Sequence, residues 1–351
     1  MIPPGAPLAL LMHDYLVPKP GLPSFGKMGL GLLRYSPNPI AAVVDETQAG
    51  ADLRALTGIA RDAPIVSTIA AARAAGAEVL VIGVATAGGV LPSRFRADIV
   101  EGLRAGLSVV NGLHVVLNDD PELAALVRPG AFIWDVRREP PDLMPGTGAV
   151  AALAVRRVLT VGTDMAIGKM TASIELDRAA RTRGLRSAFL ASGQIGMCIS
   201  GDGVALDAVR VDFAAGAVEQ MVMERAADHD VLWIEGQGSI LHPASTAWLP
   251  LVRGSCPTHL VLCHRAGQTR IARAPVPMPP LRDVAGLYEH VASVGGITPG
   301  PRVVGIALNC GHLDDSAAAH EAAAIEAETG LPTVDVVRAG ADRLLDAVLA
   351  S

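Results

Sequence analysis

The chain has 351 residues, 29 of them basic and 35 acidic, and a net charge of −6. A nucleic-acid-binding protein usually carries a basic surface, so this balance argues against a nucleic-acid partner. Half of the residues are apolar but only 3% are aromatic, so small aliphatic side chains must do most of the packing. That composition is typical of α/β layers, in which helices lie close on a buried parallel sheet. At this length we expect two domains.

The first 20 residues contain neither a positively charged start nor a long apolar run. They therefore match neither a signal peptide nor a membrane span. We expect a cytoplasmic protein with no membrane partner.

Cysteine usage points the same way. Cys256, His259, Cys263 and His264 lie within nine residues and raise the question of a metal site. The segment that contains them has the apolar pattern of a strand, so Cys263 is more simply a buried thiol. No CxxC pair occurs in the chain, which fits a reducing compartment. We expect no metal site.

Short apolar runs alternate with alanine-rich amphipathic stretches through the first 136 residues. This alternation predicts a mostly parallel, doubly wound sheet. Expected helices are Ile69 to Ala75 and Ala97 to Gly106, the second ended by its glycine. The expected strands are Leu8 to Met12, Ala41 to Val44, Val79 to Val84, Ser108 to Val110 and Phe132 to Val136.

A domain boundary is predicted in the segment Arg137 to Val150, which combines three prolines with two glycines. We place the division after residue 145, which gives domains 1–145 and 146–351.

The second part begins again with a strand, Arg157 to Val161, and a helix is expected from Lys169 to Arg183. Asp212 is the expected N-cap of a helix from Phe213 to Ala227. The other expected elements are strands Ser187 to Leu190, Val231 to Ile234, His259 to Cys263, Val303 to Leu308 and Thr333 to Val337, and a closing helix Ala341 to Leu349.

A phosphate-binding loop is predicted in the segment LTVGTDMAIGKMTASIEL, Leu159 to Leu176, where a strand passes through glycine into a helix. Such a loop presents backbone N–H groups and a helix N-terminus to a diphosphate, and Lys169 adds a positive charge. The simpler alternative is a glycine-rich turn with a solvated lysine. The strand, loop, GK and helix order favours phosphate binding. The predicted phosphate-binding residues are Gly162, Thr163, Asp164, Gly168, Lys169, Met170 and Thr171.

Two features set this loop apart. Five residues, rather than four, separate Gly162 from Gly168, a form that resembles dethiobiotin-synthetase-like P-loop proteins. Met170 stands directly after Lys169, where a hydroxyl residue normally ligates Mg²⁺. The next hydroxyl, at Thr171, is turned away by about 100° on a helix. We therefore expect bound phosphates, and the use of Mg²⁺ stays open.

Glu235 follows four apolar residues of an expected strand, which places its carboxylate at the C-terminal edge of a parallel sheet. It can ligate a metal, act as a general base, or simply cap a turn. The backbone beside it, Gly236 to Gly238, can approach a ligand closely and offer N–H groups to an oxyanion. His242, before a proline that fixes the local backbone, is either a second candidate base or a structural residue.

The segment Ser192 to Met197 is expected to form a loop on the same sheet edge. Gln194 has both a donor and an acceptor and is suited to grip a carboxylate. A plain loop without a function explains the segment equally well.

Taken together, these motifs resemble the D-glutamate N-acetyltransferase-like proteins. The most specific matches are VGTDMAIGKMT at Val161 to Thr171 and IEGQGSILHPA at Ile234 to Ala244. Ile195 departs from the pattern, because the family usually has a small hydroxyl residue there. The other matching segments cover nearly the whole chain and are Val81 to Pro92, Gly106 to Leu123, Asp135 to Arg137, Ser192 to Met197, Asp212 to Glu219, Leu251 to His264 and Gly305 to Cys310.

The resemblance implies a Rossmann-like N-terminal domain, a P-loop NTPase-like C-terminal domain, and transfer of an acetyl group from acetyl-CoA to the amine of D-glutamate in D-amino acid catabolism. Coenzyme A carries a 3′-phosphate and a diphosphate, so a P-loop can hold it without phosphoryl transfer. We also expect a homo-oligomer. The candidate general bases are Glu235, His242 and Asp164, and the candidates for binding the substrate carboxylates are Gln194, Arg253 and His114.

Two other functions remain open at this point. The same branch of P-loop proteins includes ATP-dependent ligases and kinases. A nucleotide-sensing regulatory protein would carry the same loop without catalysis.

Overall fold

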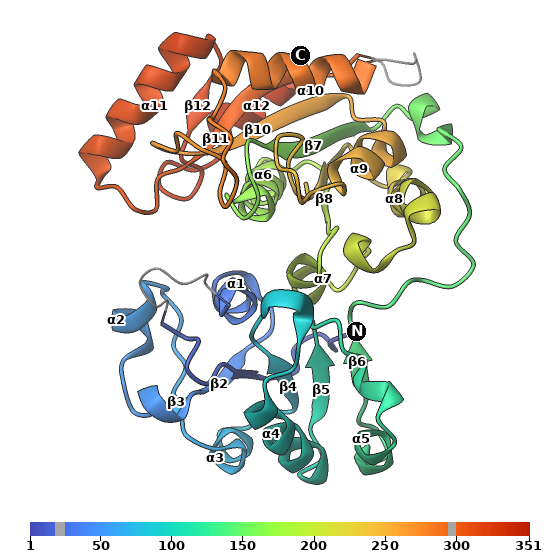
Figure 1. Ribbon diagram of the computed structural model, residues 1–351, viewed down its shortest axis with the longest axis vertical. Helices are drawn as coiled ribbons and strands as arrows, with labels where there is room; N and C mark the ends of the chain where they lie inside the picture. The colour runs from blue at the N-terminus through green and yellow to red at the C-terminus, as the bar shows by residue number, and fades with distance from the viewer. Residues whose placement is uncertain (18–24, 294–299) are drawn as a thin grey trace. The chain divides into compact units, whose positions relative to one another are not determined.

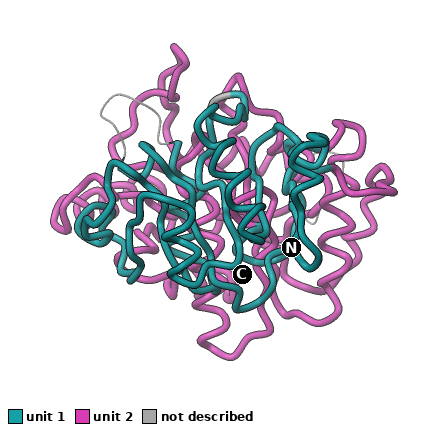
Figure 2. The backbone as a smooth tube through the Cα atoms, turned by 90° about the horizontal axis from the view of Figure 1, so that it is seen from below, with its two compact units in different colours: residues 1–138, 197–208 teal, residues 139–196, 209–351 magenta. Residues whose placement is uncertain are grey.

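The structure is a computed structural model that describes residues 1–17, 25–293 and 300–351. The chain divides into two compact units (Figure 2). Unit 1 comprises residues 1–138 and 197–208, and unit 2 comprises residues 139–196 and 209–351. The expected boundary after residue 145 falls in the first segment of unit 2. The return of residues 197–208 to unit 1 was not expected.

Unit 1 is built on one parallel sheet, and its described strands have the order β3-β2-β1-β4-β5-β6. The strand order reverses between β1 and β4, as in a Rossmann-like domain (Figure 1). The strands are β1 (Leu8–Leu11), β2 (Ile40–Val44), β3 (Ile65–Val66), β4 (Val79–Ile82), β5 (Ser108–Asn111) and β6 (Ile133–Asp135).

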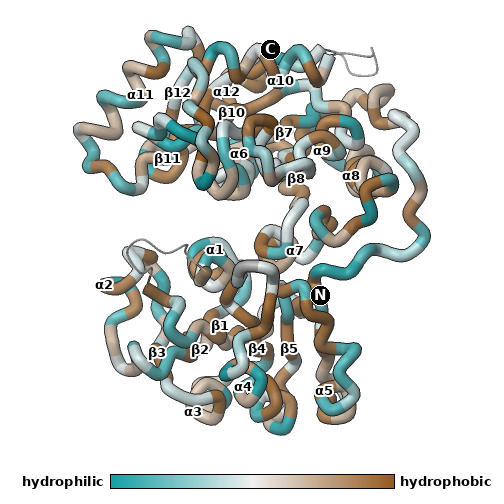
Figure 3. Tube along the Cα trace, in the orientation of Figure 1, coloured by the Kyte–Doolittle hydropathy of each residue, from teal (hydrophilic) through white to brown (hydrophobic). Residues whose placement is uncertain are grey.

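Both faces of the unit 1 sheet are covered, because every residue of β1 and β4 is buried. Figure 3 shows the apolar character of β4 and β5 as a brown trace. Ala9 and Leu11 share one face, where they pack with Phe95 and Ile99 of α4. The described helices of unit 1 are α1 (Lys27–Tyr35), α2 (Leu53–Thr57), α3 (Ile69–Ala74), α4 (Ser93–Arg104) and α5 (Pro121–Leu126).

Unit 2 contains a second parallel sheet, whose described strands have the order β12-β11-β10-β7-β9-β8. The strand that precedes the predicted phosphate loop, β7, lies inside this sheet between β10 and β9. The strands are β7 (Arg156–Gly162), β8 (Ser187–Leu190), β9 (Val231–Ile234), β10 (His259–Arg265), β11 (Arg302–Asn309) and β12 (Thr333–Val334).

Helices cover both faces of this sheet. Leu176 of α6 and Leu344 of α12 pack on one face with Val158 and Trp233. The other face receives α8 and α9, which also pack on each other. The described helices of unit 2 are α6 (Lys169–Thr182), α8 (Val211–Ala226), α9 (Trp248–Ser255), α10 (Leu281–Ser293), α11 (Asp315–Thr329) and α12 (Asp342–Ala350). One more helix, α7 (Gln194–Ser200), begins in unit 2 and ends in the segment 197–208 of unit 1.

Every element expected from the sequence is present, β8 and β9 with the expected bounds and the others with shifted ends, but two local predictions are wrong. Arg210, not Asp212, is the N-cap of α8, because the helix begins earlier and leaves Asp212 in its first turn. Residues from Gln194 onward form helix α7 rather than a loop. Ile195, Cys198 and Ile199 have helical i, i+3, i+4 spacing, which the flanking glycines obscured.

None of the helices in the described part of the chain is long and apolar enough to cross a membrane. Among the described residues, no group of three or more His, Cys, Asp or Glu side chains converges in a way that could hold a metal ion. Cys263 is a buried free thiol, as expected, and burial raises its pKa to about 12.

Candidate functional site

The loop between β7 and α6 has the backbone form that is typical of anion binding. Ala166 and Gly168 adopt left-handed conformations, with φ of 54° and 115°. Left-handed residues of this kind turn successive N–H groups toward one point. Gly168 is also the N-cap of α6, and no side chain caps the helix. The first N–H groups of α6 are therefore not satisfied by a side-chain cap, which favours an anion at this end.

Lys169, the first residue of α6, is folded into this loop. Its side chain is buried, and Nζ donates to the main-chain oxygen of Asp164 at 2.7 Å. The stem passes over two glycines: an added Cβ would lie 3.0 Å from Nζ at Gly162 and 3.0 Å from Cδ at Gly236. Burial lowers the pKa of Lys169 to about 8, although Cys263, Asp164 and Glu235 oppose this shift. Burial therefore disfavours the charged form of Lys169 more than these three neighbours favour it, and a bound anion would stabilise the charge.

Three neighbouring elements fix the loop in place. Thr163 Oγ1 lies 2.9 Å from His264 Nδ1 on β10. The Tyr288 hydroxyl of α10 donates to the oxygen of Gly162 at 2.8 Å. Asn309 Nδ2, at the end of β11, donates to the oxygen of Ile167 at 3.0 Å. The loop is thus held at its start, through Gly162 and Thr163, and near its end, through Ile167.

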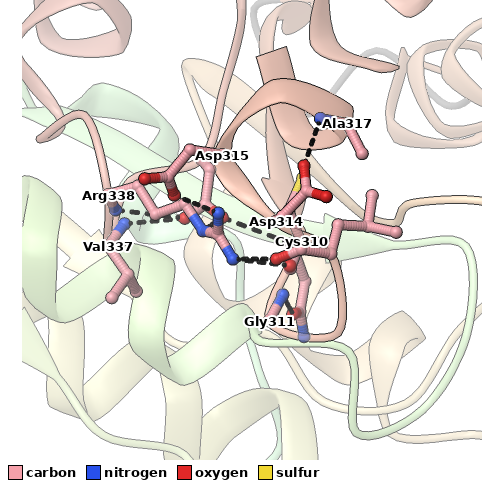
Figure 4. A network of polar contacts seen from close by, with 10 residues as sticks. Cys310, Gly311, Asp314, Asp315, Ala317, Val337 and Arg338 are labelled. Atoms are coloured by element: carbon pink, nitrogen blue, oxygen red, sulfur yellow. Dashed lines mark hydrogen bonds and ion pairs between the residues drawn. The ribbon is translucent and has the colours of Figure 1, made fainter. Parts of the chain in front are cut away.

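The turn that follows Asn309 is itself fixed by a polar network (Figure 4). Arg338 donates to the oxygen of Cys310 at 3.2 Å and forms an ion pair with Asp315 at 2.5 Å. Asn309 Oδ1 accepts the N–H of Gly311 at 3.1 Å. This network orients the Asn309 side-chain amide, which holds the loop between β7 and α6.

Asp164 serves as a second brace for the loop. Its side chain is fully buried, and Oδ1 accepts the N–H of Met165 at 2.6 Å. Oδ2 accepts the N–H of Ala272 at 2.6 Å and an N–H of the Gln268 amide. Both carboxylate oxygens are therefore engaged by the protein.

Glu235 follows β9 directly, as expected, and only 5% of its surface is exposed. Its Oε2 accepts N–H groups from Ser192 at 2.9 Å and Gly193 at 3.2 Å. An added Cβ at Gly196 would lie 2.5 Å from the same oxygen. The glycines around α7 thus allow this segment to close on the carboxylate, which also lies near enough to Lys169 to raise its pKa.

The N–H of Gly236, one of those expected to face an oxyanion, has a different partner. It donates to the buried Thr160 hydroxyl at 2.9 Å, and that hydroxyl lies 3.0 Å from Ser173 Oγ. This expectation was therefore wrong for Gly236. The Thr160 contact could not be predicted from a local pattern, because it depends on the pairing of Leu159 with Ile234 between β7 and β9.

His242 is held at both ring nitrogens. Nδ1 accepts the N–H of Ala244 at 3.1 Å, so the proton lies on Nε2. Nε2 then donates to the oxygen of Ala272 at 3.0 Å. Neither nitrogen is available to an amine in this arrangement.

The candidate substrate residues are separated in the structure. Gln194 is buried at the start of α7, next to the N–H groups that bind Glu235. Arg253 is exposed near the end of α9, where the oxygen of Ser255 accepts from Arg157 at 3.1 Å. Arg157 lies at the beginning of β7, so Arg253 sits at the opposite end of that strand from the loop. His114 belongs to unit 1.

Comparison with known proteins assigns both parts of the chain. Residues 144–345 match the P-loop domain of a family described as a domain of unknown function, DUF1611, and residues 46–139 match its Rossmann-like N-terminal domain. The chain belongs to the DUF1611 family. The expected Rossmann-like and P-loop domains are thereby confirmed.

Relatives of this DUF1611 protein have been given a function. It is 37% identical over 330 residues to a D-glutamate N-acetyltransferase of Tritonibacter scottomollicae, covering 92% of this chain and 94% of the relative. It is 34% identical over 274 residues to a D-glutamate N-acetyltransferase of a Pseudoalteromonas species, covering 77% and 81%. The expected resemblance to this group is confirmed.

A solved structure supports the fold. The crystal structure of a DUF1611 family protein from Anabaena variabilis is similar with a TM-score of 0.94 and 56% sequence identity. The match covers 99% of this chain and 100% of that protein.

Proposed function

We propose that this protein is an N-acetyltransferase that moves the acetyl group of acetyl-CoA to the amine of D-glutamate. The observation that carries the proposal is the 37% identity, over 92% of the chain, to a relative named for that activity. Such coverage includes both units, so the likeness is not confined to the common P-loop domain.

The loop supports a role in holding the phosphates of coenzyme A. Its uncapped helix N-terminus and its buried Lys169 favour a polyanion. Met170 stands where a magnesium-ligating hydroxyl would be expected, so the loop is better suited to holding phosphates than to transferring them. This favours the acetyltransferase over a ligase or kinase.

The reaction requires a group that accepts protons. The amine nitrogen bonds to the acetyl carbon and the carbon–sulfur bond breaks; the amine gives up a proton and the sulfur gains one. Glu235 is the carboxylate that we assign to the amine proton, because it lies beside Lys169 and at the start of α7. Asp164 and His242 are engaged with Ala272 and are assigned to holding the loop.

The test is an assay of the purified protein with acetyl-CoA and D-glutamate, with L-glutamate and D-aspartate as alternative acceptors. We expect free thiol and N-acetyl-D-glutamate to appear in equal amounts, without ATP and in the presence of a chelator. Product formation that stops when ATP is omitted would assign the protein to the ligases. ATP hydrolysis without acetyl transfer would assign it to nucleotide-dependent enzymes, and nucleotide binding without turnover to regulators.

A further inference from the structure

A group of polar side chains lies at the carboxyl ends of the unit 1 strands. Lys27 begins α1, which follows β1. His114 follows β5 and Arg137 follows β6. Ligands of open α/β sheets bind at this edge, where the strand order reverses. We call Lys27, His114, Arg137 and their neighbour Asp207 the Lys27–Arg137 cluster.

Lys27 occupies the same local position as Lys169. Both lysines are the first residue of the helix that follows the first strand of a sheet, and in both cases a glycine N-cap precedes a Lys-Met pair. No side chain caps α1 at Gly26. The first turn of α1 lies against the end of β4, because the N–H of Gly29 donates to the oxygen of Gly83 at 2.7 Å. Lys27 is therefore at the reversal point between β1 and β4.

The cluster has more positive than negative charge. Asp207 Oδ2 lies 3.0 Å from Arg137 Nη2 and 4.0 Å from His114 Nε2. Lys27 is an exposed residue, but partial desolvation of its ammonium group lowers its pKa. Repulsion from Arg137 lowers this pKa further, and attraction to Asp207 raises it. Desolvation and Arg137 also lower the pKa of His114, which favours the neutral ring at pH 7. Two cations thus share one carboxylate.

Arg137 also has a hydrogen-bond donor for which the described residues supply no acceptor. Its side chain is only 10% exposed, and its Nε is buried without a hydrogen-bond partner among the described residues. Leaving a buried N–H of a charged group without an acceptor is unfavourable, and such groups are rare in native proteins. A ligand that completes the arginine fork would remove this cost.

We propose that the Lys27–Arg137 cluster binds a carboxylate of the acceptor amino acid, an inference that rests on the proposed function. The structure already seats one carboxylate, that of Asp207, against Arg137 and His114. The remaining charge of the cluster is about +1 (two cations and one carboxylate), which suits a glutamate with its net charge of about −1. A phosphate dianion is matched less well, and unit 2 offers it a more complete site.

Calorimetry on the full-length protein tests the site without relying on catalysis. The probes are glutarate, which carries two carboxylates and no amine, D-glutamate, and inorganic phosphate. The variants are Arg137→Met and Lys27→Met. Arg138→Met is the matched control, because Arg138 is the next residue and its ion pair with Asp119 lies on the surface. Lys27→Met keeps the test available if replacement of the more buried Arg137 prevents folding.

We expect Arg137→Met and Lys27→Met each to weaken glutarate and D-glutamate binding on the order of tenfold to a hundredfold. Arg138→Met should stay within about twofold of the wild type. In the acetyl-transfer assay the same two variants should raise KM for D-glutamate and leave KM for acetyl-CoA unchanged.

The inference is overturned if both variants bind glutarate as the wild type does, or if the wild type binds no glutarate at millimolar concentration. It is also overturned if phosphate, and not glutarate, loses affinity in the two variants. Failure of the proposed function gives a different result: a wild type that makes no N-acetyl-D-glutamate, whatever its glutarate affinity.

Discussion

Asp164 and His242 bind the two ends of a single residue, Ala272. The carboxylate accepts its N–H at 2.6 Å, and the imidazole donates to its carbonyl oxygen at 3.0 Å. The two side chains therefore hold the segment after β10 against the loop that precedes α6. This explains why two residues that the sequence offers as catalytic candidates are both occupied by the protein itself.

Replacing Lys169 by methionine should weaken the binding of coenzyme A. Methionine keeps most of the buried stem that packs over Gly162 and Gly236 but removes the charge. A charge-assisted hydrogen bond of this kind contributes about 1.5–3 kcal/mol, so we expect the affinity to fall roughly tenfold to a hundredfold. Isothermal calorimetry with coenzyme A measures the change. Arg178→Met, an exposed cation on the same helix, is the control. An unchanged affinity in Lys169→Met would place the cofactor elsewhere.

The affinity for coenzyme A should decrease as the pH rises above about 8. The pKa of Lys169 is lowered to about 8 by burial, so the lysine of the unliganded protein loses its charge above that pH. Phosphates bind the charged form, and binding at higher pH must therefore take up a proton. This lowers the affinity by up to about tenfold for each pH unit.

Calorimetry at pH 9 in buffers of different ionisation enthalpy should detect an uptake of about one proton in the wild type. Lys169→Met should lose most of this uptake, and the comparison subtracts the titration of coenzyme A itself. Equal proton uptake in the two proteins would show that another group is responsible.

Glu235→Gln should lower kcat with little effect on folding. The glutamine oxygen can still accept the N–H groups of Ser192 and Gly193, but it cannot take a proton from the amine. A general base contributes on the order of 10²–10⁴ in rate. Steady-state kinetics and thermal unfolding are measured on Glu235→Gln and, for comparison, on Asp164→Asn and His242→Ala.

The two comparison variants should lose stability more than intrinsic rate, because they loosen the hold on Ala272. If Glu235→Gln keeps its rate while Asp164→Asn or His242→Ala folds normally and is inactive, the base has been assigned to the wrong residue.

Gly236→Ala should be strongly destabilising. An added Cβ would lie 1.7 Å from the oxygen of Thr160, so β7 and the turn after β9 must separate. Overpacking of this type costs about 1–3 kcal/mol, occasionally more. Gly286→Ala is the matched control, because Gly286 lies exposed within α10 and its added Cβ meets nothing within 4 Å. That control should be neutral or stabilising by about 0.5–1 kcal/mol. Urea unfolding distinguishes the two, and equal stabilities would contradict the close contact.

The sequence predicted the parts of the site that depend on local order. The strand, glycine loop and helix around Lys169 are contiguous, and Glu235 follows its strand directly. Pattern alone was sufficient for these. It was insufficient for the Thr160 contact with Gly236, which arises from strand pairing across the sheet. It was also insufficient to place Arg253, because nothing in a local segment indicates to which end of β7 the helix α9 brings it.

The Lys27–Arg137 cluster in unit 1 could not be predicted from local sequence patterns either, because its members are distant in the sequence. His114 was singled out without Lys27 or Asp207, which come from distant parts of the chain. Asp207 lies beyond the end of α7, and no pattern in the sequence linked it to His114 or Lys27.

Because residues 197–208 belong to unit 1, the two units cannot be completed one after the other as the chain is synthesised. A ribosome that has completed the first 138 residues has not yet made the segment that supplies Asp207, so the Rossmann-like part emerges unfinished. By the time that segment appears, β7, α6 and β8 of the other part have also been made, while their neighbours β9 to β12 are still absent. Neither half can be completed before the other has begun. A fragment cut at residue 138 would consequently lack a piece of its own fold, and one starting at residue 139 would carry a segment with nothing to fold against.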